Sequence, residues 1–187
     1  FGWPRVLYGF VYCSSAMRTG NSVVQGGGEK IVFGEAVNDP PSPRVRAVAE
    51  CFDRLGVRYD VPKDMRAAQW KKFILNVGIN QAQAVLRVPN RELQQNPEAL
   101  RFARTLMDEA AAVGAALGVA GAAAVPAWAE TVILGASPEN RTSMLQDVEA
   151  GRIPEIDLFA GTVCRLGQQC GISTPANDRA LRALSPA

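Results

Sequence analysis

Three polar side chains recur every fourth residue in an otherwise apolar segment of the chain. Lys72, Asn76 and Asn80 stand at positions i, i+4 and i+8. On a helix this spacing places them on one face, with a drift of about 40° per step and about 12 Å from first to last. Polar groups set among apolar neighbours need hydrogen-bond partners, which the oxygens of a carboxylate, carbonyl or hydroxyl ligand would supply. Burial also lowers the pKa of a lysine, which suits such a residue to proton transfer near neutral pH.

The same spacing has an alternative interpretation. A lysine can lay its stem along the surface with its ammonium in water, and two amides can cap a neighbouring helix. The spacing alone leaves both interpretations open. Lys71 is a second candidate for the ammonium, but only Lys72 lies in register with both asparagines.

A second group of polar residues follows near the C-terminus. Ser143 and Gln146 are one helical turn apart, and both side chains can hydrogen-bond a carboxylate or a hydroxyl. Glu155 follows Pro154 and is expected to begin the next helix. An acidic side chain is favoured there by the helix dipole alone, which is a structural explanation for Glu155 that needs no ligand.

Composition excludes several classes of protein. The chain has 187 residues, of which 48% are hydrophobic, and a formal net charge of +2. The apolar fraction supports a folded core, and the balanced charge argues against a nucleic-acid partner. No apolar run reaches the roughly 18 residues of a membrane span. Histidine is absent, so Ser-His-Asp and Cys-His mechanisms are excluded within this chain, and a proton donor must be lysine, tyrosine, cysteine or a carboxylic acid.

The cysteines and the first residues bear on the setting of the protein. The spacings of Cys13, Cys51, Cys164 and Cys170 match no zinc or redox pattern, so we expect reduced thiols and a cytoplasmic location. The chain opens at Phe1 directly into a strand-like run, which leads us to expect that an upstream part is missing.

Two regions of different texture are expected. Strands are predicted at residues 5–13, 21–25 and 30–33, with a turn at residues 26–28 between the last two. Beyond the proline-rich stretch at 40–43, the pattern is almost entirely helical. Helices are predicted at residues 44–55, 64–86, 97–117, 127–134, 138–149, 155–169 and 175–184, with Asp64 and Gly171 as caps. We therefore predict a division into residues 1–38 and 39–187.

Several motifs, in order along the chain, resemble the C-terminal part of the ketopantoate reductase (2-dehydropantoate 2-reductase) family. They are Trp70-x-Lys72-x-x-x-Asn76-x-x-x-Asn80, Pro89-Asn90 followed by Glu92-Leu93, Ser143-Met144-Leu145-Gln146-Asp147 with Glu155-Ile156-Asp157, and Gly171-Ile172-x-Thr174-Pro175-x-Asn177. The opening segment from Gly9 to Glu35 resembles the last strands of the family's nucleotide-binding domain. The resemblance implies a mainly α fold, a helical domain of the 6-phosphogluconate-dehydrogenase-like type preceded by a few β-strands from the end of a Rossmann-like domain.

The resemblance also implies a reaction and a set of roles. The reaction is NADPH-dependent reduction of a 2-oxo acid, 2-dehydropantoate, to pantoate, in pantothenate and coenzyme A biosynthesis. Lys72 would donate the proton to the ketone oxygen, and Glu155 would lie near the nicotinamide end of the cofactor. The residues implied to bind the 2-oxo acid are Asn76, Asn80, Asn90, Ser143 and Gln146.

One departure from the family's pattern is large. A dinucleotide needs a Gly-x-Gly-x-x-Gly turn for its pyrophosphate, and no such motif occurs in the 187 residues. We therefore expect the chain alone to bind NADPH poorly and to be inactive. Opening strands cut from their sheet would expose unpaired edges, which predicts a homodimer or a swapped assembly formed through residues 1–36. Two alternatives stay open, namely a reductase for a different 2-oxo acid and a non-catalytic helical association module.

Overall fold

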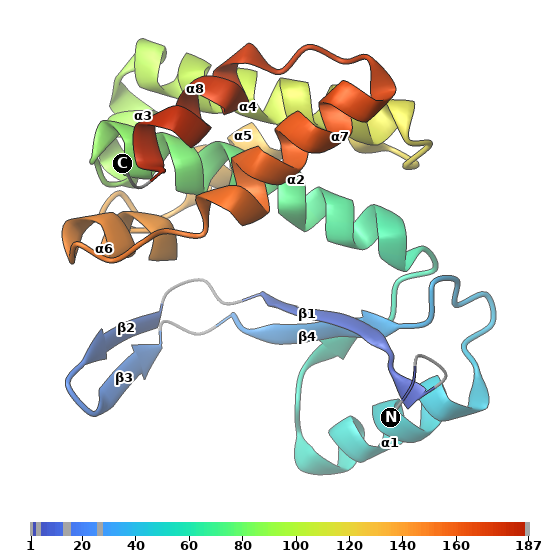
Figure 1. Cartoon of the computed structure of the whole chain (residues 1–187). Coiled ribbons are helices and arrows are strands. Elements are labelled where there is room, and N and C mark those ends of the chain that lie inside the picture. Colours follow the sequence, from blue (N-terminus) through green and yellow to red (C-terminus); the bar gives the residue numbers. More distant parts are fainter. Residues whose placement is uncertain (1, 3–4, 13–15, 26–27, 186–187) are drawn as a thin grey trace. The chain divides into compact units, whose positions relative to one another are not determined.

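The structure is a computed structural model that describes residue 2 and residues 5–12, 16–25 and 28–185. It divides into two compact units, Phe1–Gln69 and Trp70–Ala187 (Figure 1). This division falls after Gln69, whereas the sequence pattern placed a boundary after residue 38. The difference arises because a helix that packs on the sheet of the first unit, and a short strand that pairs within that sheet, both follow residue 38.

The first unit is built on a three-stranded sheet with the order β1-β4-β5. Strand β1 (Tyr8–Tyr12) pairs antiparallel with β4 (Lys30–Gly34), and β4 pairs parallel with β5 (Tyr59–Asp60). Strands β2 (Ala16–Thr19) and β3 (Ser22–Gln25) form a separate two-stranded sheet. The predicted strands correspond to β1, β3 and β4, whereas β2 and β5 were not predicted. Cys13 and the first two glycines of the predicted turn lie outside the described residues.

Helix α1 (Pro43–Leu55) connects the parallel strands β4 and β5, as parallel pairing requires a crossover. Its N-terminus is capped by Ser42, whose hydroxyl oxygen accepts from the backbone N–H of Val45 at 3.4 Å. The helix packs on the sheet through Phe52, whose ring contacts that of Phe33 with centroids 5.3 Å apart. This βαβ unit is the reason that residues 43–60 belong with the strands.

The second unit is helical, and α2 begins in the first unit and continues into it. The elements in chain order are α2 (Met65–Leu86), α3 (Asn90–Gln95), α4 (Pro97–Ala116), the 3₁₀ helix η2 (Ala122–Ala124), α5 (Val125–Gly135), α6 (Ser143–Glu149), the π-helical turn η3 (Asp157–Gly161), α7 (Thr162–Cys170) and α8 (Pro175–Leu184). The mainly helical fold with a small sheet is therefore confirmed.

Most predicted helices have their counterparts here, and the caps do as well. The Asp64 carboxylate accepts from the N–H of Ala67 at 2.9 Å, and Gly171 ends α7 with a φ of 69°. One prediction was wrong, because the helix expected at 138–149 begins only at Ser143. The helix expected at 155–169 is present, since residues 156–170 are helical without a break, and it contains the π-helical turn η3. The short helix α3 was not predicted.

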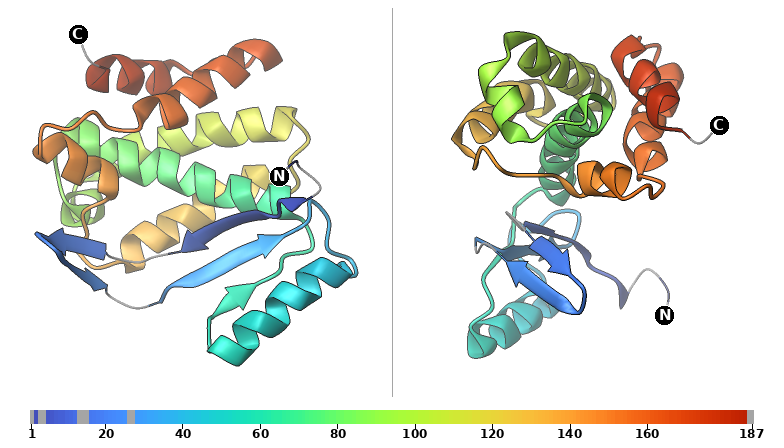
Figure 2. Two further views of the ribbon diagram at one scale, coloured as in Figure 1. Left: turned by 60° about the horizontal axis from the view of Figure 1, so that its bottom comes forward. Right: turned by 90° about the vertical axis from the view of Figure 1, so that its left-hand side faces the viewer.

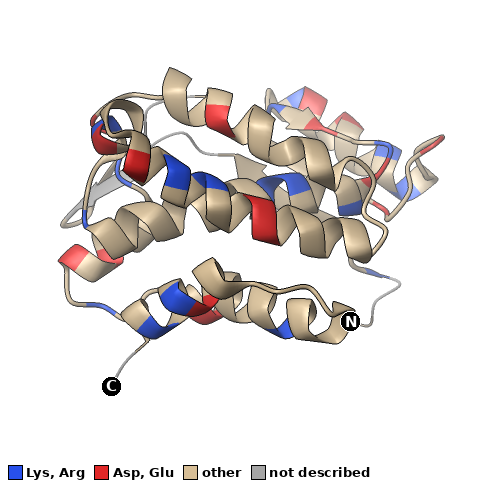
Figure 3. Cartoon of the chain, turned by 90° about the horizontal axis from the view of Figure 1, so that it is seen from above, with Lys and Arg blue, Asp and Glu red and all other residues tan. Residues whose placement is uncertain are grey.

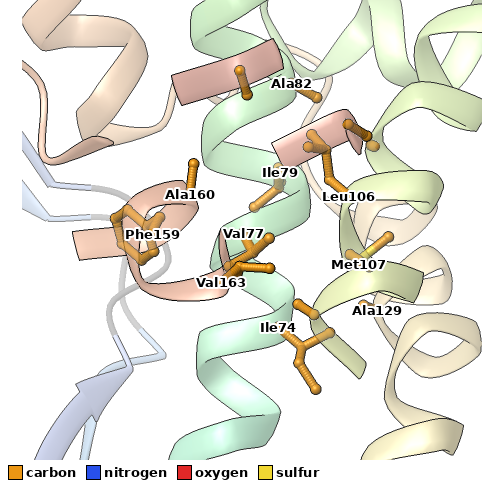
Figure 4. Close-up of a cluster of buried hydrophobic side chains, with 14 of the residues drawn as sticks. Ile74, Val77, Ile79, Ala82, Leu106, Met107, Ala129, Phe159, Ala160 and Val163 are labelled. Carbon is orange, nitrogen blue, oxygen red and sulfur yellow. The ribbon is translucent and has the colours of Figure 1, made fainter. Parts of the chain in front are cut away.

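Helices α2 and α4 approach each other closely in the core (Figure 4). A Cβ atom added to Gly78 on α2 would lie 2.3 Å from Cγ of Met107 on α4. One added to Gly114 on α4 would lie 2.9 Å from the ring of Trp70 on α2. The absence of a side chain at these two glycines therefore sets the distance between the helices. Val77, which faces this core, is fully buried.

A buried polar network joins α2, α4 and α8. The Glu109 carboxylate accepts from the backbone N–H groups of Ala176 and Asn177, at 2.8 and 3.0 Å, at the N-terminus of α8. The Asn177 amide donates to Glu109 at 2.8 Å and accepts from Nε2 of Gln81 at 3.0 Å. These contacts hold α8 on α4 and α2. Helix α8 lies beside α7 in both views of Figure 2.

Figure 3 shows residues of both signs distributed over the helical elements. Helix α2 is an exception, because its charged residues Arg66, Lys71 and Lys72 are all basic. In the part of the chain that the structure describes, no helix combines the length and the apolar character needed to cross a membrane.

Candidate active site

The site is built on α2, whose sequence combines two faces. Lys72, Asn76 and Asn80 lie on this helix, as the spacing predicts, and they form what we term the α2 polar face. At about 100° per residue, Gly78 lies roughly 160° around the axis from the middle of this face. The glycine side of α2 packs against α4, so the α2 polar face points away from that contact.

Burial increases along the α2 polar face. Lys72 and Asn76 are half-buried, and Asn80 is only 8% exposed. Among the described residues, no hydrogen bond is formed by the side-chain amide of Asn76 or of Asn80. Neither amide is among the fully buried side-chain atoms that lack a partner, so both amides reach the surface of the helical unit, where the oxygens of a ligand could bind them.

The neighbouring lysine has a different environment. The Lys71 ammonium lies 3.9 Å from the centroid of the Trp128 ring on α5, which is a cation–π contact. Lys71 is turned about 100° from Lys72 around the helix axis and lies on the side of Gly78. The structure thus separates the two lysines by face, and only Lys72 belongs to the α2 polar face.

The loop before α6 is fixed to α2 and α3 by backbone contacts. The Asn140 carbonyl accepts from the N–H of Asn90 at 3.0 Å, and the Pro138 carbonyl accepts from the N–H of Arg91 at 2.7 Å. The N–H of Thr142 donates to the side chain of Gln83 on α2 at 2.9 Å. These bonds engage residues 138–142 outside any helix, which is why the predicted helix starts late.

Ser143 and Gln146 lie in the first turn of α6. Ser143 is exposed and follows Thr142, whose hydroxyl oxygen caps the helix by accepting from the N–H of Leu145 at 3.4 Å. Gln146 is half-buried, and its Nε2 donates to the Arg141 carbonyl at 3.0 Å. A side-chain amide nitrogen has two N–H donors, so one bond to Arg141 leaves the second for another acceptor.

Asn90 has a structural task in this position. Its side chain is fully buried, and Nδ2 donates to the carbonyls of Ile133 at 2.9 Å and Ser137 at 3.4 Å. It therefore fixes the end of α5 and the following loop to the start of α3. Its Oδ1 is buried and has no hydrogen-bond partner among the described residues, so this oxygen stays available as an acceptor while Nδ2 holds the two carbonyls.

Glu155 is exposed and stands at the start of the segment that leads into η3. The following residues are anchored on α2, because the Phe159 ring of η3 stacks on the Phe73 ring with centroids 6.1 Å apart and 22° between the planes. Figure 4 shows Phe159 and Ala160 of η3 beside α2. π-Helical turns are rare and occur often at functional sites.

The structure thus ties both partner segments to α2, the helix that carries Lys72. One contact is from Gln83 to Thr142 before Ser143, and the other is from Phe73 to Phe159 after Glu155. Sequence reasoning missed all four of these supporting residues. Gln83 left a signal, since it falls only about 20° from Lys72 around the axis of α2 and so continues the α2 polar face.

Solved structures share the fold of this chain. A dimeric ketopantoate reductase from Staphylococcus aureus has a TM-score of 0.83 at 21% identity, covering 95% of this chain and 60% of that one. D-mandelate dehydrogenase solved with NADH and anilino(oxo)acetate also gives 0.83 at 21% identity, covering 95% and 58%. The chain therefore has the fold of one part of these oxidoreductases.

Sequence then defines the family. Residues 64–187 match the family described as ketopantoate reductase PanE/ApbA C terminal. The 2-dehydropantoate 2-reductase of Archaeoglobus fulgidus is 31% identical over 175 residues, which cover 92% of this chain and 58% of the archaeal protein. The chain belongs to the ketopantoate reductase family, and it spans between half and two thirds of the length of this relative.

Proposed function

We propose that this chain supplies the substrate-binding and proton-donating part of an NADPH-dependent reductase that converts 2-dehydropantoate to pantoate. The observation that carries the proposal is the α2 polar face, where an almost buried amide at Asn80 forms no hydrogen bond within the described residues and lies in register with Lys72. The family membership and the 31% identity to a 2-dehydropantoate 2-reductase support the same reaction.

The residues divide the work in the following way. Asn76 and Asn80 hydrogen-bond the 2-oxo acid along the α2 polar face. Ser143 and the second N–H of Gln146 bind its carboxylate from α6. Asn90 holds the loop that leads to α6 through Nδ2, and its unpartnered Oδ1 accepts from a hydroxyl group of the substrate.

Lys72 is the proton donor. When bound, the nicotinamide of the cofactor supplies the hydride to C2 of the oxo acid. Negative charge then develops on the C2 oxygen, and the Lys72 ammonium stabilises it and transfers a proton to it. Interactions that strengthen only as this charge appears lower the barrier, whereas those equally strong in the ground state do not.

This chain does not hold the cofactor by itself. Its 187 residues contain no Gly-x-Gly-x-x-Gly turn for a pyrophosphate, so nucleotide binding falls to a further half of the enzyme. Glu155, exposed before η3, is the residue of this chain that we place near the nicotinamide. We further propose a cytoplasmic homodimer, because Cys51, Cys164 and Cys170 are free thiols and a relative of the same fold is dimeric.

The identity of the 2-oxo acid has an alternative, because a related reductase could act on a different acid. The same fold occurs in D-mandelate dehydrogenase, so the fold alone does not fix the acid. The test measures NADPH and NADH consumption with 2-dehydropantoate and a panel of other 2-oxo acids, in the enzyme that carries this chain joined to a nucleotide-binding half. Highest kcat/KM for 2-dehydropantoate is expected. A higher kcat/KM for another 2-oxo acid would make that acid the substrate in place of 2-dehydropantoate. Inactivity on every acid of the panel would favour the non-catalytic association module.

Asn80→Leu tests the amides of the α2 polar face. Hydrogen bonds to a charged group contribute about 1.5–3 kcal/mol, so kcat/KM for the 2-oxo acid should fall about 10- to 100-fold. The matched control is Gln95→Leu, which removes an exposed amide from α3. Equal kcat/KM in the two variants would remove Asn80 from substrate binding.

A further inference from the structure

Gln83 is a fully buried amide that binds the loop before α6 from the side of α2. Its Oε1 accepts from the backbone N–H of Thr142 at 2.9 Å, and its Nε2 donates more weakly to the Asn140 carbonyl at 3.4 Å. Thr142 is the N-cap of α6, so its own N–H has no partner inside that helix. One side chain therefore fixes both ends of the three-residue segment that leads directly to Ser143.

The position of Gln83 on α2 relates this segment to the candidate site. It lies three residues after Asn80, which makes the two side chains neighbours on the helix surface. Around the axis it falls about 20° from Lys72, between the directions of Lys72 and Asn76. Gln83, which holds the start of α6, thus lies on the same helix and on the same side of it as the α2 polar face.

We propose that Gln83 is a positioning residue, which holds Ser143 in register with the α2 polar face so that Ser143 can bind the carboxylate of the 2-oxo acid. The inference rests on the proposed function. Gln83 does not touch substrate in this account. It acts through the backbone of Thr142, and its loss would release the first turn of α6 while α2 keeps Lys72 and Asn80 in place.

A second amide in the same unit provides a matched control. Gln94 on α3 makes comparable contacts, since its Nε2 donates to the carbonyls of Ile133 at 3.0 Å, Leu134 at 3.2 Å and Ala136 at 2.9 Å. These carbonyls lie at the end of α5 and not at the start of α6. Gln94→Met therefore removes a similar set of amide-to-backbone bonds without touching Thr142.

The experiment compares Gln83→Met with Gln94→Met in two measurements. In the 187-residue chain, amide hydrogen exchange at Thr142 should accelerate at least about tenfold in Gln83→Met and stay unchanged in Gln94→Met. In the enzyme that also carries a nucleotide-binding half, Gln83→Met should raise the KM for 2-dehydropantoate about tenfold while kcat changes less than about threefold.

A double variant separates positioning from general damage. Because Gln83 acts through Ser143, adding Gln83→Met to Ser143→Ala should raise KM little beyond Ser143→Ala alone. Gln83→Glu, which keeps an acceptor for the Thr142 N–H, should recover much of the wild-type KM. If Gln83→Met does not fold, Gln83→Asn, whose shorter side chain withdraws the amide from Thr142, takes its place and should raise KM in the same way.

The outcomes also distinguish the two proposals. Loss of all 2-oxo acid reduction in the wild-type enzyme would overturn the proposed function, whereas the exchange measurement would still test whether Gln83 holds the loop. If the wild type is active, two results would overturn the role of Gln83. One is the same KM in Gln83→Met and Gln94→Met. The other is a KM in the double variant that equals the full product of the Ser143→Ala and Gln83→Met effects.

Discussion

Gly78→Ala tests the packing that orients α2. The added Cβ would lie 2.3 Å from Cγ and 2.7 Å from Sδ of Met107, and 3.1 Å from the Ala103 carbonyl oxygen. Met107 is flexible, but it is fully buried, so it has no open space into which to move. Overpacking of this kind costs about 1–3 kcal/mol. Alanine regains about 1 kcal/mol through its higher helix propensity, so we expect a net loss of up to about 2 kcal/mol, and a stability about 1–3 kcal/mol below that of a helical Gly→Ala variant without a clash.

The assay is denaturant unfolding of the 187-residue chain, followed by circular dichroism. Gly135→Ala is the matched control, because Gly135 is also helical and a Cβ there meets nothing within 4 Å. That variant should be neutral or more stable than wild type. Met107→Ala should be less damaging in the Gly78→Ala background than alone, because it removes the clash. A Gly78→Ala chain as stable as the Gly135→Ala chain would refute the close contact of α2 with α4.

Two further predictions concern η3 and the first unit. Phe159→Ala removes the ring that stacks on Phe73, and since Phe159 is 7% exposed we expect a loss of about 3–5 kcal/mol in unfolding free energy; a loss under about 1 kcal/mol would contradict the anchoring of η3 on α2. Glu35 has a pKa below its ordinary value of 4.5, chiefly because the Arg44 guanidinium hydrogen-bonds it at 2.5 Å. Its ionised form is therefore favoured in the folded state, so its stabilising effect is present at neutral pH and is lost as the pH falls through that lowered pKa. Glu35→Gln should accordingly reduce the drop in Tm as the pH falls from about 5 through the lowered pKa, and an unchanged drop would show that the pair does not couple to folding.

Much of the helical unit could be predicted because its signals are local. The Asp64 cap, the Gly171 C-cap and the four-residue spacing of the α2 polar face depend on residues that are close in sequence. The spacing also distinguished Lys72 from Lys71, and the contact of Lys71 with Trp128 supports that choice.

The parts that could not be predicted depend on contacts between distant residues. Residues 138–142 follow a helical pattern, but Gln83, Asn90 and Arg91 bind their backbone and prevent them from joining α6. Strand β5 has two residues and exists only because β4 provides a partner. The tasks of Asn90 and Gln83 likewise became visible only with their partners at the end of α5 and before α6.

The most direct test of the account is the turnover of Lys72→Ala in the enzyme that joins this chain to a nucleotide-binding half, with Lys71→Ala as the matched control. General acid catalysis by a side chain contributes at least about a hundredfold, so kcat for reduction of 2-dehydropantoate should fall by that factor or more in Lys72→Ala. Lys71→Ala, which loses only the contact with Trp128, should keep kcat near that of wild type. Near-wild-type kcat in Lys72→Ala would contradict the assignment of this lysine as proton donor.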